Sequence, residues 1–171
     1  MTMEPESWTG RTWSFGLPAR RLASVLERVR GTPARAEELV ARVPEEALSA
    51  RVGSRWSAKE HIAHLDDLHE LDETRLAEFA SGAEALTAAD MKNTRTETAR
   101  HNETGMRDVT TRFRSHRAEL VEKLESLSED THDVYCMHPR LGQRLRLVDW
   151  VYFVAEHDDH HLVLARRALE R

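Results

Sequence analysis

Two histidine clusters are the parts of this sequence best suited to chemistry. The first is EHIAH at residues 60–64, and the second is HDDHH at residues 157–161. On a helix, residues four apart lie on the same face, with their Cβ atoms about 5–6 Å from each other. The imidazoles of His157 and His161 have this spacing and can therefore converge on one divalent metal ion.

The helix face that would carry His157 and His161 is otherwise apolar. It also presents Trp150, Val154, Leu164 and Ala168 at helical spacing. The pair is therefore expected to point into the protein, where a polar group without a partner costs about 1–3 kcal/mol. A bound metal ion would be such a partner, whereas core histidines that are hydrogen-bonded to their neighbours are the plainer alternative.

The first cluster offers a third ligand. His61 and His64 both lie on a helix predicted over residues 57–80, and the helical period alone leaves the choice between them open. Glu60 could serve as a ligand or a base, but Ser57 and Glu60 fit a capping box, which favours a structural role. Three histidines with one open position are typical of catalytic zinc sites, where the ion lowers the pKa of a bound water or thiol.

Carboxylates beside the second cluster are candidates for orienting its histidines through hydrogen bonds. They are Glu156, Asp158 and Asp159, although Asp158, Asp159 and His160 are expected at the side of the helix or facing solvent. Four arginines of an earlier predicted helix are interpreted as solvated surface: Arg107, Arg112, Arg114 and Arg117.

Helical periodicity runs through most of the chain and positions these clusters. It predicts helices over residues 18–30, 33–43, 57–80, 106–127 and 145–169. Gly31 is expected to end the first of them, with Thr32 as the N-cap and Pro33 as the first helical residue of the second. Segments 83–103 and 128–144 are predicted to be connections that line the mouth of the bundle, and no strand of useful length is expected.

The composition fits one soluble globular domain over residues 1–171, with residues 1–16 as an N-terminal extension. The chain is 40% hydrophobic and 32% charged, and its net charge of −5 gives no general attraction for nucleic acid. The single cysteine, Cys136, excludes a disulfide within the chain, favours a reducing cytosol, and is expected to be a small buried residue rather than a nucleophile. The first residues lack the apolar run of a signal peptide, and no segment approaches the roughly 18 apolar residues that span a bilayer.

Both clusters sit in longer motifs that resemble the DinB/YfiT-like superfamily. The motifs are WSAKEHIAHL at residues 56–65, HPRLG at 138–142, DW at 149–150 and EHDDHHL at 156–162. The resemblance extends from about residue 20 to the end of the chain. It implies an all-α four-helix bundle, here with an additional short N-terminal helix, and a site for zinc or, next in order, nickel. By position in the motifs, the implied ligands are His64, His157 and His161, which selects His64 over His61.

The resemblance also implies a class of activity. The family includes thiol S-transferases and isomerases that use bacillithiol, mycothiol or glutathione, together with metal-dependent hydrolases. We therefore expect a cytoplasmic, homodimeric enzyme that activates a low-molecular-weight thiol or water for attack on a small electrophile, with thiol transfer favoured over hydrolysis. No membrane or nucleic-acid partner is expected.

The expected cosubstrate is mycothiol or another low-molecular-weight thiol. Among the 25 basic residues only Lys59, Lys92 and Lys123 are lysines, which indicates a GC-rich bacterial genome. An actinobacterial source of this kind would make mycothiol the plausible thiol. Two alternatives stay open. One is a non-catalytic binding module with a structural metal site, and the other is a bundle without metal whose core histidines are hydrogen-bonded.

Overall fold

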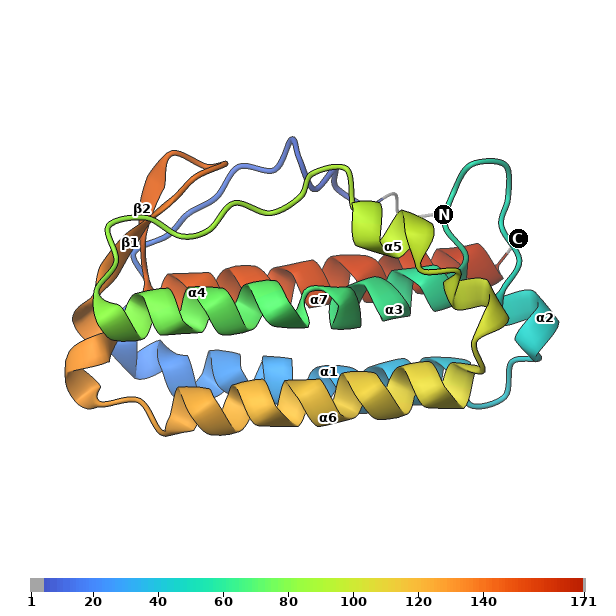
Figure 1. Ribbon diagram of the computed structural model, residues 1–171, viewed down its shortest axis with the longest axis horizontal. Coiled ribbons are helices and arrows are strands. Elements are labelled where there is room, and N and C mark those ends of the chain that lie inside the picture. The colour runs from blue at the N-terminus through green and yellow to red at the C-terminus, as the bar shows by residue number, and fades with distance from the viewer. Residues whose placement is uncertain (1–4, 171) are drawn as a thin grey trace.

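The computed structural model describes residues 5–170 and is built almost entirely of helices (Figure 1). Four long helical segments form a bundle, as predicted: α1 (Leu22–Val40), α3 (Ala58–Asp67) continued by α4 (His69–Ser81), α6 (Met106–Glu125) and α7 (Leu147–Leu169). Short helices complete the chain: η1 (Ala19–Arg21), α2 (Glu45–Leu48), α5 (Thr94–Thr98), η2 (His101–Glu103) and η3 (Glu129–Asp133). None of the helices among residues 5–170 has the length and apolar character needed to cross a lipid bilayer.

Each long segment packs against two others. α1 and α3 both contact α6 and α7, so α1 lies diagonally across the bundle from α3 and α4. In Figure 1, α1 and α7 run in one direction, and α3, α4 and α6 run in the other. The connection from α4 to α6, residues 82–105, must therefore travel back along the bundle. We call it the crossover; it passes over the face formed by α3, α4 and α7, beside the N-terminal residues.

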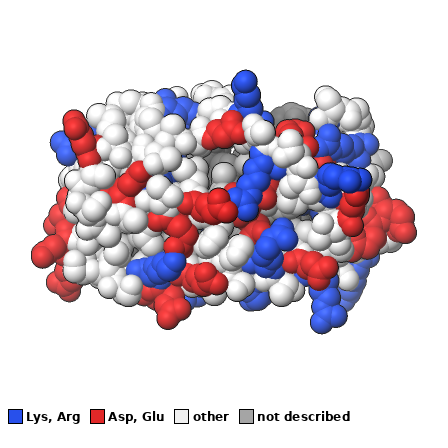
Figure 2. All heavy atoms as spheres, viewed as in Figure 1, with Lys and Arg blue, Asp and Glu red and all other residues white. Residues whose placement is uncertain are grey.

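The apolar core divides into two clusters along the bundle axis. Phe79 and Trp150 belong to the cluster near the start of α7, and Ile62 and Phe113 belong to the other. Between them lies a layer of buried polar side chains, one from each long segment, which we call the polar layer: Thr32, Asp72, Arg117 and Asp158. On the outer surface, acidic and basic side chains are interspersed over the face shown in Figure 2.

Two predicted boundaries are wrong. α1 runs without interruption through Gly31, Thr32 and Pro33, so the two helices predicted over 18–30 and 33–43 are joined into one. Pro33 lacks the N–H that would bond one turn back, but buried residues on both sides of it hold the helix in the core. Conversely, the helix predicted over 57–80 breaks at Leu68, whose ψ of −3° separates α3 from α4.

The 128–144 connection contains a hairpin that periodicity did not predict. Strands β1 (Tyr135–His138) and β2 (Gln143–Arg146) pair antiparallel, with His138 opposite Gln143. Four-residue strands are too short to show a clear alternation. Gly142, at φ +61°, supplies the left-handed backbone that the turn between them requires.

Candidate metal centre

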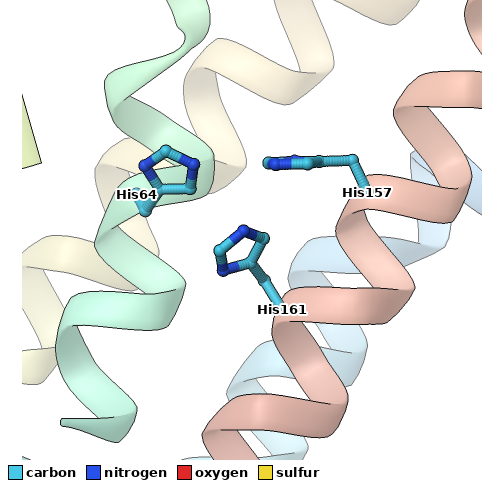
Figure 3. A group of neighbouring side chains, drawn as sticks. All are labelled: His64, His157 and His161. Carbon is cyan, nitrogen blue, oxygen red and sulfur yellow. The ribbon is translucent and has the colours of Figure 1, made fainter. Parts of the chain in front are cut away.

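The structure brings His64, His157 and His161 together in the middle of the bundle. His64 lies near the end of α3, and the other two lie on successive turns of α7, the antiparallel neighbour of α3. Within residues 5–170 these three form a group whose candidate ligand nitrogens all lie within 4.8 Å of one another. Figure 3 shows the three imidazoles turned toward a common space between the two helices. This geometry suits a small divalent ion bound by imidazole nitrogens.

A hydrogen-bonded chain fixes the tautomer of His64. The Thr96 hydroxyl donates its proton to Asp67 Oδ2 at 2.7 Å, so it must accept the Nδ1 proton of His64, 2.9 Å away. The lone pair of His64 is therefore on Nε2. His101 Nε2 also lies 2.8 Å from Asp67 Oδ2 and completes the chain. Sequence analysis missed Thr96 and His101 because both lie in the crossover, where no periodicity marks a buried side.

His61 lies behind His161 rather than in the group of three. The two Nδ1 atoms are 3.1 Å apart, so one of them carries a proton and donates it to the other. Trp56 covers the same side of the centre, with its ring centroid 5.0 Å from that of His64 and 6.0 Å from that of His161. His61 is thus placed to orient His161, and Trp56 shields the centre from solvent.

The histidines of the centre are held neutral. Burial is the largest cause and lowers the pKa of His61 and of His64 to about 4, with the charge of neighbouring histidines adding to it and Asp67 opposing it at His64. The pKa values of His157 and His161 are also well below the usual value for the same two reasons. Because a metal binds the unprotonated nitrogen, these imidazoles are in the ligand form at neutral pH.

Glu60 has the structural role that its position indicates. Its side chain accepts the Ser57 N–H at 2.9 Å while the Ser57 hydroxyl accepts the Glu60 N–H at 3.1 Å, so the predicted capping box is confirmed. Burial alone would raise the pKa of Glu60, but hydrogen bonds from Arg51, Ser57 and Asn102 lower it to about 2. Glu60 is therefore ionised and hydrogen-bonded to Arg51 and Ser57, and its low pKa makes it a poor base.

The acidic residues beside the second cluster bind arginines instead of orienting histidines. Asp158 is fully buried, which contradicts its expected position at the side of the helix or facing solvent. It accepts hydrogen bonds from Arg117 at 3.0 Å and from the Thr32 hydroxyl at 2.7 Å. Arg117 is itself 4% exposed, so its interpretation as solvated surface is also wrong. Glu156 and Asp159 both pair with Arg28 at the rim.

The three histidines open onto a cavity of about 560 Å³. Its walls come from α3, α4 and α7, from crossover residues 88–91 and 93, and from residues 138–140 of the hairpin, so both predicted connections line it. Trp8 closes one side, with its ring centroid 4.9 Å from that of His157. From the sequence, Trp8 could be either a packing anchor or part of a pocket wall, and the structure shows the second.

Three contacts hold the segment around Trp8 against α7. Arg11 forms an ion pair with Glu156 at 2.9 Å, and the backbone N–H groups of Gly16 and Leu17 both donate to Asp149 Oδ1 at 2.9 Å. The described part of the extension is therefore a cover for the cavity. What the extension does could not be predicted from its composition, because its tryptophans have no periodic context.

Asp72 supplies a titratable carboxyl on the cavity wall. It is 6% exposed, and burial raises its pKa to about 6, although the charges of Arg117 and Arg75 oppose the rise. A carboxyl with such a pKa can hold or release a proton near neutral pH. Sequence analysis did not single out Asp72, since it stands among charged residues on a helix.

Comparisons with known proteins agree with this fold. A family model described as the DinB superfamily matches residues 28–165. YfiT from Bacillus subtilis, described as a probable metal-dependent hydrolase with an unusual four-helix bundle topology, is similar in structure, with a TM-score of 0.78 at 14% identity over 94% of this chain and 93% of YfiT. A comparison with curated proteins finds no match.

The mycothiol-dependent maleylpyruvate isomerase is also similar in structure. The TM-score is 0.67 at 15% identity, over 86% of this chain and 60% of the isomerase. This chain thus corresponds to about three-fifths of the isomerase, and at this level of identity the likeness concerns the fold alone.

Proposed function

Because the chain belongs to the DinB superfamily, we propose that it is a metal-dependent enzyme acting on a small electrophilic molecule. The observation that carries the proposal is the group of three neutral imidazoles, with ligand nitrogens within 4.8 Å of one another, at the wall of a 560 Å³ cavity. His64, His157 and His161 would hold the ion. Zinc is the first candidate and nickel the second, since both accept imidazole ligands.

The donor set fits an open site rather than a closed one. Three histidines leave at least one coordination position for a ligand from the cavity, which is the arrangement of catalytic zinc. His64 presents Nε2, because Nδ1 is engaged by Thr96. The bound ion would supply one effect, a lowered pKa of a thiol or water that occupies the open position.

The other residues of the site bind and orient. Trp8 and Trp56 exclude water from two sides of the centre, and the apolar side chains of Leu71 and Phe153 receive the body of the electrophile. With a pKa of about 6, Asp72 can exchange a proton near neutral pH, and so remove a proton from, or deliver one to, a group in the cavity.

Thiol transfer is the first candidate reaction, and hydrolysis is the second. A 560 Å³ cavity lies within the range of small-molecule sites and exceeds what an attacking water needs, so there is room for a thiol beside the electrophile. A mycothiol-dependent neighbour and the scarcity of lysine make mycothiol the thiol to test first. The cytoplasmic location and the homodimer stay predictions, and light scattering of the purified protein checks the latter.

Elemental analysis tests the proposal. The protein as purified should contain about one zinc or nickel ion per chain, and His157→Ala should lose it. His132→Ala is the matched control because His132 lies on η3, outside the cavity walls. The proposal fails if His157→Ala and His64→Ala keep the metal content of the wild type.

Chelation separates an enzyme from a binding module with a structural ion. Because the two apolar clusters lie on either side of the centre, the bundle should stay folded without metal, with a thermal midpoint within a few degrees of the loaded protein. Loaded protein should then consume mycothiol in the presence of small electrophiles, and chelated protein should not. Collapse of the fold on chelation would favour the structural role.

A further inference from the structure

A second group of polar side chains, separate from the three histidines, lines the same cavity. Arg75 comes from α4, His138 from the end of β1 and Arg140 from the hairpin turn. Arg75 is 4% exposed and His138 is 2% exposed. The three lie close enough to affect one another, since Arg75 and Arg140 add to burial in lowering the pKa of His138 to about 4. We call them the anion subsite.

The atoms that this group leaves unpaired are donors. His138 Nδ1 accepts the Leu141 N–H at 3.4 Å, so the proton of the neutral ring is on Nε2. That Nε2–H group is buried and has no hydrogen-bond partner among residues 5–170, and the same holds for Nη2 of Arg140. Two buried donors without acceptors point to a ligand that supplies oxygen atoms.

Arg140 also lacks a counter-charge. It forms no ion pair with any residue in the described part of the chain, and its guanidinium rests on the rings of Phe153, at 5.7 Å, and Trp8, at 6.0 Å. Two buried cations elsewhere in the bundle are paired, Arg117 with Asp158 and Lys59 with Glu45. Arg140 is half-buried, and a cation partly removed from water without a counter-charge is unfavourable, so an anion that enters the cavity would gain by pairing with it.

Arg75 adds a positive charge to the subsite, and its hydrogen bonds go to a backbone carbonyl rather than to an acidic side chain. Its Nε and Nη2 donate to the Thr87 carbonyl at 3.0 and 2.9 Å, which holds the guanidinium against the crossover. Asp72 lies nearby and offsets part of this charge. Asp72 on the same wall would repel a phosphate, which can place two charges on one group, more than a single carboxylate group, which places only one charge there.

We propose that the anion subsite binds a carboxylate group of the substrate, so that the electrophile is a small organic acid. That the bound acid is a substrate rests on the proposed function, whereas the binding of a carboxylate does not. Phe153, which Arg140 covers, precedes His157 by one turn on α7. Four residues at 1.5 Å each place Phe153 about 6 Å along the helix axis from His157, the nearer α7 ligand, so the carboxylate would sit about one helical turn from that ligand. The molecule's reactive carbon is expected a few bonds from its carboxylate.

Calorimetric titration with simple acids tests the subsite. The probe is succinate, its uncharged counterpart is succinamide, and inorganic phosphate is the alternative anion. The titrations use the protein as purified and the same protein after chelation, because a carboxylate could otherwise bind an ion directly. We expect succinate to bind both forms at least tenfold more tightly than succinamide or phosphate.

Variants of the hairpin locate the binding. Arg140→Gln should weaken succinate binding at least tenfold, and Arg144→Gln, the matched loss of charge on the same hairpin outside the cavity walls, less than twofold. His138→Phe, a second variant, should weaken binding by removing the Nε2–H donor. Circular dichroism and metal content should match the wild type, so a failed subsite is distinguishable from a failed metal centre.

Three results would overturn the inference. They are equal binding of succinamide, equal or tighter binding of phosphate, and unchanged succinate binding in folded Arg140→Gln. If Arg140→Gln does not fold, His138→Phe with the Arg144→Gln control decides. If chelated wild type binds succinate but the purified protein holds no metal, the subsite stands and the proposed function falls.

Discussion

The Thr96 hydroxyl accepts a hydrogen bond from Nδ1 of His64 at 2.9 Å and donates one to Asp67 Oδ2 at 2.7 Å. A residue of the crossover therefore decides which nitrogen of an α3 histidine can bind a metal. Hydrogen bonds of this kind fix the tautomer and the ring orientation of a ligand. The crossover is part of the centre as well as a connection between helices.

Thr96→Val should weaken metal binding about 10- to 100-fold with little change in fold, because valine keeps the shape of threonine but cannot accept the His64 proton. Competition with a chromophoric chelator measures the affinity. Thr98→Val, on the exposed side of the same short helix, is the matched control and should bind like the wild type. Equal affinities for the two variants would show that Thr96 does not orient His64.

His64→Ala should lose stoichiometric metal, whereas His61→Ala should keep it with weakened affinity. His61 contacts the centre only through His161, at 3.1 Å between their Nδ1 atoms, and is not one of the three grouped histidines. Mass spectrometry of the metals in both purified variants distinguishes the two roles. Loss of the ion from His61→Ala and retention in His64→Ala would reverse the assignment.

Acid should destabilise the metal-free protein below about pH 6.5. The pKa of His61, His64 and His138 is about 4 in the folded protein, below the usual 6.5, so between these pH values the unfolded chain binds more protons than the folded one. The free energy of unfolding therefore falls as the pH falls, by up to about 1.4 kcal/mol per pH unit for each histidine.

Urea unfolding of chelated protein at pH 7.5, 6.5, 5.5 and 4.5 measures this dependence. His138→Asn should show a shallower fall between pH 6.5 and 4.5, because it removes one of the contributing groups. An identical slope for this variant and the wild type would contradict a neutral, buried His138.

Arg117→Leu should cost about 3–5 kcal/mol of the free energy of unfolding, since it leaves Asp158 buried without its ion pair. The double variant Arg117→Leu/Asp158→Leu should recover part of this loss. Arg114 lies on α6 as Arg117 does, but its ion pair with Glu37 of α1 is exposed. Arg114→Leu should therefore cost less than about 1 kcal/mol. Urea denaturation compares all three, and a small loss for Arg117→Leu would mean that water or another group reaches Asp158.

Periodicity predicted the bundle and the side of α7 that faces inward, because apolar side chains at helical spacing leave few alternatives. The inward side carries His157 and His161, and α3 brings His64 opposite them. That these residues bind a metal stays a prediction. The choice of His64 over His61 came from the family motif, since residues three apart both lie near the same face of a helix.

The polar layer could not be predicted in the same way. A buried Asp158 looks like a solvated one in the sequence, since its partner Arg117 is 41 positions away and Thr32 is 126 positions away. The donors of the anion subsite could not be predicted either, because they are far apart in the sequence and come together only when the hairpin folds against α4. Gly31, Thr32 and Pro33 have the residue types of a helix end followed by a new start, and the sequence does not show the buried packing that keeps α1 continuous there.

The position of Trp8 has a practical consequence for purification. Its ring packs on His157, so any peptide fused before Met1 is joined to the cavity cover by only seven residues. Fully extended, such a linker spans at most about 3.3–3.6 Å per residue, so a polyhistidine tag could place foreign imidazoles within reach of the centre. Metal stoichiometry should therefore be measured on protein from which the tag has been cleaved.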